Sequence, residues 1–262
     1  MARISKKLGL AIGGCLIASA LAVTALPQPP AAQTDGKPAT PADRTTMTTA
    51  PQTDALPQEE PTGIRYPLTD LEVADAQFPL LLQNGDLRLD IPFSFDGINP
   101  DADGTEARNI AACTLTNLSG RHLEEAELIL VTRDGSHIRF CAQQIPHHAK
   151  VLLFCTDTLE LPPQDQWDQL YYRATYSAAS SMLGGSLEAI VSGTRIQLTN
   201  TTDAPIPPFV LYCHDLLGEE YFGGKAYAYH VNTIPVGETV TIDATDSIIG
   251  MVGAVYASEI TE

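Results

Sequence analysis

After residue 77, apolar and polar residues alternate in short runs, which is the pattern of half-buried β-strands and not of helices. The clearest run follows Asn84-Gly85, a dipeptide that supplies the two positive-φ positions of a hairpin turn. We therefore expect a strand over 78–83, a turn at the dipeptide, and a strand over 86–95 with one apolar face. Pro92 donates no ladder hydrogen bond, so the second strand is expected to lie at a sheet edge.

Similar runs recur to the end of the chain. They predict strands over 109–117, 127–132, 136–142, 149–156 and 170–176, and then over 187–191, 194–200, 209–214, 225–231, 238–243 and 248–257. Arg133-Asp134-Gly135 marks a second hairpin, and the stretch from Leu161 to Trp167 is expected to be a loop. Short strands about 8–12 residues apart predict an all-β sandwich architecture.

One short motif occurs twice, 83 residues apart, as Leu115-Thr116-Asn117 and Leu198-Thr199-Asn200. Each copy is followed by a hydroxyl residue two positions later, then by a second strand and an Ile-Pro pair. A shared order of landmarks indicates a duplicated domain, which we place at 67–180 and 181–262. Both copies form Asn-x-Ser/Thr sequons, but their matching position favours turn chemistry, with the side chains bonding nearby backbone.

The two copies resemble the small immunoglobulin-like FxLyD-type domains of bacterial secreted and wall-associated proteins. The resemblance rests on Leu115-Thr116-Asn117 with 128–135, and on Leu198-Thr199-Asn200 with Phe209-Val210-Leu211-Tyr212. It implies two tandem immunoglobulin-like β-sandwiches that act as a binding or spacer module without catalysis. The second copy departs from the family pattern because Cys213 and His214 separate Tyr212 from Asp215.

The segment before the strands has a different composition. Residues 1–7 are basic and residues 8–26 are uncharged and mostly apolar, which is typical of a signal peptide or of an N-terminal apolar helix that anchors the chain in a membrane. A third reading is lipidation at Cys15, because Ile12-Gly13-Gly14-Cys15 resembles a lipobox. All three readings place the rest of the chain outside the cytoplasm. Residues 27–66 are rich in Pro and Thr and are expected to form a disordered linker.

The net charge of the chain excludes some classes of binding partner. The chain carries 15 Lys and Arg against 32 Asp and Glu, a formal net charge of −17. Because such a surface repels phosphate backbones and anionic lipid, we expect no nucleic-acid partner and no membrane contact except through residues 8–26. A protein or glycan at the cell surface is the expected partner.

Three sets of residues are candidate sites. Oxygen-bearing side chains crowd one loop, in a pattern that resembles the start of a Ca²⁺ loop without its closing acid: Asp96, Asn99, Asp101, Asp103 and Glu106. An aromatic face for a sugar or peptide is a second candidate, although alternating aromatics also suit a sandwich core: Tyr221, Phe222, Tyr227 and Tyr229. Cys141 and Cys155 lie on successive predicted strands and could form a disulfide, or remain buried thiols.

No catalytic motif is present in the sequence. We therefore favour a non-enzymatic surface module, with no catalytic residues and no required cofactor. Two alternatives stay open. One is an exported hydrolase or metal-dependent enzyme with a site between the two domains, which would need converging side chains such as His147, His148, His214 and His230. The other is a cell-wall module stabilised by Ca²⁺ at the acidic loop.

Overall fold

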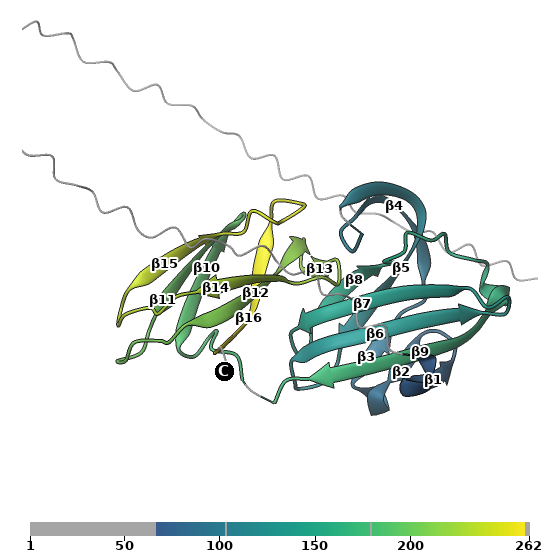
Figure 1. Ribbon diagram of the computed structural model, residues 1–262, viewed down its shortest axis with the longest axis horizontal. Coiled ribbons are helices and arrows are strands. Elements are labelled where there is room, and N and C mark those ends of the chain that lie inside the picture. The colour runs from purple at the N-terminus through teal and green to yellow at the C-terminus, as the bar shows by residue number, and fades with distance from the viewer. Residues whose placement is uncertain (1–66, 103, 179, 260–262) are drawn as a thin grey trace, which may run out of the picture. The chain divides into compact units, whose positions relative to one another are not determined.

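The computed structural model describes residues 67–102, 104–178 and 180–259 (Figure 1). This part of the chain is built from sixteen strands, and its only helical turns are three-residue 3-10 turns at Leu68–Asp70, Gln83–Gly85 and Gln164–Gln166. The all-β prediction is confirmed. The leader at 1–26 and the linker at 27–66 lie outside the described residues. Within those residues, no helix is long and apolar enough to span a bilayer.

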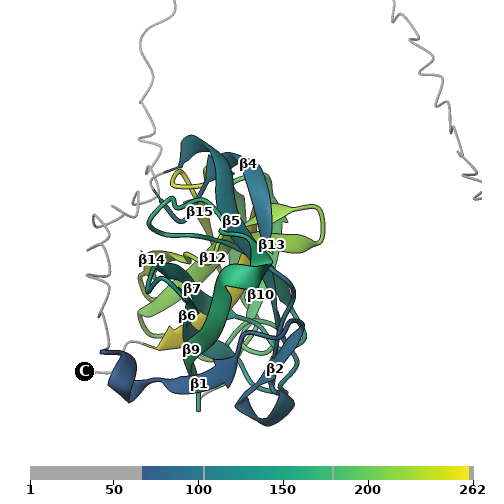
Figure 2. The same cartoon turned by 90° about the vertical axis from the view of Figure 1, so that its right-hand side faces the viewer.

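We call the part that carries strands β1–β9 the N-terminal lobe. One of its sheets is antiparallel, in the order β1 (Glu72–Asp75), β9 (Trp167–Tyr176), β6 (Leu123–Thr132) and β7 (His137–Ile145). Figure 1 shows β9, β6 and β7 side by side, and Figure 2 shows the short β1 beside β9.

The second sheet of this lobe runs through β2 (Leu80–Leu82), β3 (Leu87–Leu89), β5 (Thr105–Asn117) and β8 (Lys150–Phe154). A further strand, β4 (Phe93–Asn99), also pairs with β5. Alternate residues of the two sheets meet in one buried core, which includes Leu89, Leu115, Leu128 and Phe140. The lobe is therefore a two-layered β structure closed around apolar side chains.

The C-terminal lobe carries strands β10–β16. It has a three-stranded sheet of β10 (Leu187–Ser192), β11 (Arg195–Asn200) and β15 (Thr239–Asp243). Against it lies β12 (Phe209–Leu217), which pairs with β14 (Tyr227–Val231) and β16 (Val252–Glu259), while a short β13 (Glu220–Phe222) forms a hairpin with its end. Residues of both layers form a second core, which includes Leu198, Phe209 and Tyr229.

The first predicted hairpin is present, but its turn is longer than expected. Leu82 pairs with Leu87, so four residues form the loop, and Gln83, Asn84 and Gly85 all have positive φ. The strand expected over 86–95 is divided into β3 and β4, with Pro92 in the break. Pro92 does mark an edge, because beyond it β4 pairs with β5 alone. The side chain of Phe93 is consequently 40% exposed instead of lying in the core.

The duplicated asparagine makes the same hydrogen bonds in both lobes. Asn117 Nδ2 donates to the carbonyl oxygens of Arg121 (2.9 Å), Ile145 (3.1 Å) and Pro146 (3.1 Å), and its Oδ1 accepts from the N–H and the hydroxyl of Ser119.

Asn200 Nδ2 donates to the carbonyl oxygens of Ala204 (2.8 Å), Ile234 (3.0 Å) and Pro235 (3.2 Å), and its Oδ1 accepts from the N–H and the hydroxyl of Thr202. The bonds to nearby backbone agree with the predicted turn chemistry. Each asparagine also ties the end of its strand to an Ile-Pro segment far along the chain, which the motif did not predict. Both are almost completely buried, and each side-chain nitrogen already makes three hydrogen bonds.

Strand pairing extends this correspondence. Leu87 pairs with Asn117 as Leu187 pairs with Asn200, and Thr116 pairs with Lys150 as Thr199 pairs with Thr239. Strands β3, β5 and β8 therefore correspond to β10, β11 and β15. In the other layer, the strand order β7-β6-β9 of the N-terminal lobe matches the order β14-β12-β16 of the C-terminal lobe.

Candidate functional site

A set of polar contacts lies where the two lobes meet. Strand β13 of the C-terminal lobe pairs in parallel with β8 of the N-terminal lobe, with Tyr221 opposite Val151 and Phe222 opposite Leu152. The N–H of Gly223 donates to Leu152 O at 2.9 Å, and the N–H of Gln143 donates to Gly224 O at 2.8 Å. One sheet thereby continues from one lobe into the other.

Asp101 is the central side chain of this junction. Its Oδ2 accepts the N–H of Phe154 at 2.9 Å, and its Oδ1 accepts the N–H groups of Gly224 at 2.7 Å and Lys225 at 3.2 Å. Burial raises the pKa of Asp101 to about 6, although the three N–H groups act in the opposite direction. One carboxyl group therefore joins backbone from both lobes.

The two glycines of the junction have no space for side chains. A Cβ on Gly224 would lie 1.7 Å from Cys141 O, and a Cβ on Gly223 would lie 2.6 Å from Pro100 Cγ. Gly223 also has a φ of +90°, which other residues rarely adopt. Glycine at these positions lets the two backbones approach closely enough to bond.

His214, on β12, adds a second buried polar group. Its Nε2 donates to Gln143 O at 2.6 Å, whereas its Nδ1 has no hydrogen-bond partner among the described residues. Burial lowers the pKa of His214 to about 4, against the hydrogen bond to Gln143, which raises it. The imidazole is therefore neutral at pH 7 and works as a structural donor.

Aromatic packing fills the rest of the contact. Phe154 lies 4.8 Å from Phe95 and 5.0 Å from Phe222, measured between ring centroids, with the rings edge to face. At a second point His122 stacks on Tyr256 at 4.1 Å. The junction combines a shared sheet, buried polar groups and an apolar cluster, which are features of a packed contact.

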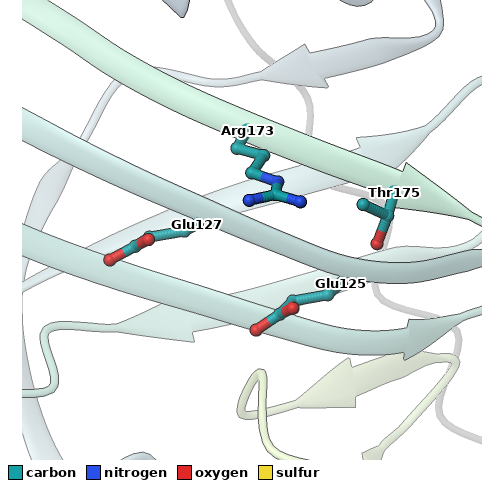
Figure 3. Close-up of a pocket in the computed structure, with 4 residues that line it drawn as sticks. All are labelled: Glu125, Glu127, Arg173 and Thr175. Atoms are coloured by element: carbon teal, nitrogen blue, oxygen red, sulfur yellow. The ribbon is translucent and has the colours of Figure 1, made fainter. Parts of the chain in front are cut away.

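A shallow depression on the outer face of the four-stranded sheet is the other candidate site (Figure 3). Glu125 and Glu127 of β6 stand opposite Thr175 and Arg173 of β9. Glu127 is 6% exposed, and its Oε1 lies 3.4 Å from Arg139 Nε, while its Oε2 has no hydrogen-bond partner among the described residues. Loss of water raises the pKa of Glu127, and Arg139 acts against that rise. The depression offers a carboxylate oxygen to a donor group but encloses little space.

The predicted acidic loop is used largely for internal bonds. Asn99 is fully buried and donates to Cys155 O, Asp96 accepts the N–H of Asn109, and Asp101 belongs to the junction. Asp103 lies outside the described residues, and Glu106 lies on β5. In the part of the chain that the structure describes, no three His, Cys, Asp or Glu side chains are grouped to hold a metal ion.

The predicted aromatic face is not formed, because most of its members are in the cores. Tyr227 and Tyr229 are 7% and 4% exposed, and their hydroxyl groups donate to Asp215 and Asp246. Phe222 is also buried, and Tyr221 packs partly against the N-terminal core. The interpretation of alternating aromatics as sandwich core is the correct one.

The strand arrangement also removes the basis of the proposed disulfide. Cys141 lies on β7 and Cys155 follows β8, but β7 pairs with β6 and β8 with β5, so the two strands belong to different sheets. Cys113, Cys141, Cys155 and Cys213 are all free thiols. The histidines do not converge either, since His147, His148 and His230 are exposed and His214 is buried at the junction.

The sequence carries one local signal for the junction, the Gly223-Gly224 pair. Asp101 is predicted to be a cation ligand, whereas its partners are three backbone N–H groups, one from Phe154 and two from a segment more than 120 residues away. The Gly223-Gly224 pair was not singled out, although adjacent glycines often mark a close approach of backbones. No protein-family model matches the chain, and no curated protein matches its sequence.

Proposed function

We propose that the chain is a non-enzymatic, extracytoplasmic surface module made of two immunoglobulin-like β-sandwiches. The junction holds the two lobes as one rigid unit, which suits a spacer or a support for a binding face. The leader pattern of residues 1–26 and the Pro/Thr-rich stretch of 27–66 support a position outside the cytoplasm, with the chain tethered to a membrane or secreted.

One observation carries this proposal, namely the Asp101 carboxyl group that accepts backbone N–H groups from both lobes. A partly buried carboxyl group whose two oxygens accept three backbone N–H groups suits a structural role that joins the two lobes. His214 is occupied in the same way by Gln143 O. These contacts support a structural role for Asp101 and His214 over a role in an enzyme or a Ca²⁺ site.

The test compares two glycine variants of the full chain. Gly224→Ala places a Cβ against Cys141 O, whereas Gly120→Ala adds a Cβ with no atom within 4 Å. We expect the unmodified chain and Gly120→Ala to unfold in one cooperative transition. Gly224→Ala is expected to unfold in two steps and to be cleaved by protease between the lobes. A single, unshifted transition in Gly224→Ala would contradict a rigid junction.

The location is tested separately by protease treatment of intact cells of the source organism. We expect the chain to be degraded without lysis. Protection until the cells are lysed would contradict an extracytoplasmic module.

A further inference from the structure

The two lobes differ along one seam. By seam we mean the gap between the edge strand of one sheet and the neighbouring edge strand of the other sheet. In the N-terminal lobe, the segment from Glu72 to Leu82 crosses this seam, because β1 pairs with the edge of β9 and β2 pairs with the edge of β3. In the C-terminal lobe, the corresponding strands are β16 and β10. Among the described residues, no strand pairs with the free edge of either one.

The backbone of β10 presents unused hydrogen-bonding groups at this seam. Leu187 directs its N–H to Met182 O and its carbonyl oxygen to the N–H of Gly184, so both groups point away from β11. Because these directions alternate along an antiparallel strand, Ala189 and Val191 also point their N–H and C=O groups away from β11. No described backbone group bonds to them there.

Strand β16 faces the same seam. The N–H of Val252 donates to Gly193 O, and the carbonyl oxygen of Ala257 accepts the N–H of Met182, so the seam is closed by backbone bonds at both ends. Two residues after Val252, and just before a register shift of β16 against β12, Ala254 shares the direction of Val252 and points its N–H group between the two strands. The opening is therefore bounded by strand edges on both sides.

A groove of about 400 Å³ occupies this opening. Small or apolar residues line it, including Leu183, Gly184, Gly185, Ala189 and Ala254. Leu183, Ala189 and Ala254 pack against the C-terminal core but are only partly buried. The groove thus gives access to the core and leaves space for alternate apolar side chains of an inserted strand.

The net charge of the C-terminal lobe indicates which kind of segment can bind in the seam. Residues 181–262 contain ten Asp and Glu but only two bases, Arg195 and Lys225. Glu188 lies at the groove itself. The segment that fills the seam of the N-terminal lobe carries Glu72 and Asp75, so the same segment from a second copy would be repelled.

We propose that the seam between β10 and β16 binds an extended segment of a partner protein in which apolar residues alternate with Lys or Arg. The segment adds a strand to the edges that Ala189 and Ala254 present, directs its apolar side chains into the C-terminal core, and directs its basic side chains to the acidic surface. This inference rests on the proposed function, since it gives the surface module a class of partner.

The test measures binding of a blocked synthetic peptide, Lys-Val-Lys-Val-Lys-Val-Lys, to the full chain by fluorescence anisotropy. A peptide with Glu in place of Lys is the charge control. We expect the Lys peptide to bind and the Glu peptide to bind at least tenfold more weakly. No binding of the Lys peptide, or equal binding of the two peptides, would overturn the proposal.

Two variants locate the site. Ala189→Pro removes an N–H group that β11 does not use, and Ala254→Leu fills the groove, so each is expected to weaken binding at least tenfold. Ile190→Ser is the matched control, because this side chain is 57% exposed and lies on the outer face of β10. Unchanged binding in Ala189→Pro and Ala254→Leu would overturn the assignment to the seam.

Hydrogen exchange of the unmodified chain gives a result that does not depend on how the variants fold. Added Lys peptide should slow exchange of the Ala189 and Ala254 amides, and unchanged rates would contradict strand addition. A dimer in gel filtration that Ala254→Leu dissociates would show that a second copy fills the seam and would overturn the partner proposed here. Failure of the peptide tests leaves the Gly224→Ala test of the rigid junction unaffected.

Discussion

The two lobes contain the same asparagine corner and corresponding strands, yet only one of them is closed. In the N-terminal lobe, β1 and β2 cover the edges of β9 and β3, whereas the corresponding edges of β16 and β10 pair with no strand within the described residues and are joined only by backbone bonds at the ends of the seam. The corner is thus a structural unit that does not depend on a closed seam. The open edges and the lobe junction are the places where the two lobes differ, and they are where binding and rigidity are expected to reside.

The largest effect is expected from removing the corner in either lobe. Asn117→Ala or Asn200→Ala leaves one buried and two partly buried carbonyl oxygens without this donor, which should lower the free energy of unfolding by about 3 kcal/mol or more. Urea unfolding of both variants measures this loss. A large loss in one lobe and none in the other would show that the two corners are not equivalent.

A matched pair of leucines measures the difference between the closed and open seams. Leu82 of β2 is 2% exposed in the N-terminal core, so Leu82→Ala should cost about 2–5 kcal/mol. Leu183 lines the open groove and is partly exposed, so Leu183→Ala should cost less than about 1 kcal/mol. Equal losses in thermal or urea unfolding would mean that the seam of the C-terminal lobe is as well packed as that of the other lobe.

The junction predicts two opposing dependences of stability on pH. The folded chain holds a proton on Asp101 up to about pH 6, above the ordinary value of 3.8, so this group stabilises the fold as the pH falls from about 6 to 4. His214 is protonated in the unfolded chain near pH 6.5 but only near pH 4 in the folded chain, so it destabilises the fold over the same interval.

Single variants should separate the two dependences. His214→Gln should be more stable at pH 5 than at pH 7, and Asp101→Asn should be less stable at pH 5 than at pH 7, each by about 1–2 kcal/mol. The unmodified chain should change less than either variant. Slopes of the same sign in both variants would contradict the assigned protonation states.

The smallest effect is expected from thiol chemistry. Burial raises the pKa of Cys141 and of Cys213 to about 12, so these thiols stay protonated near neutral pH. Labelling by iodoacetamide at pH 7.5 should be at least about 100-fold slower for them in the folded chain than in urea. Detection of a Cys141–Cys155 disulfide by mass spectrometry would contradict the assignment of these two residues as free thiols.

Local pattern predicted most of the strands and the corner, but not the short strands β1 and β13. Asn117 and Asn200 could be recognised because their closest partners lie two to four residues away and because the motif repeats. The alternation of Tyr227 and Tyr229 likewise indicated a core face, which their burial confirms. Such features depend on sequence spacing alone.

Features that depend on distant segments could not be derived in this way. Asp101 and Gly224 are brought together by tertiary structure, and nothing near Asp101 indicates that its partners will be backbone N–H groups. Cys141 and Cys155 seemed to be on neighbouring strands because the chain between them is short, but that chain crosses from one layer to the other. The open seam appears only when the pairing partners of the two lobes are compared.

Native-state hydrogen exchange tests the difference between the lobes most directly. Leu89 and Ala189 hold corresponding positions on β3 and β10, but the former is covered by β2 and the latter faces the groove. Leu170 of β9 is covered by β1 and is the reference for Ala254 of β16. Without any partner, we expect the amides of Ala189 and Ala254 to exchange much faster than those of Leu89 and Leu170. Equal protection of the four amides would contradict an open seam in the C-terminal lobe.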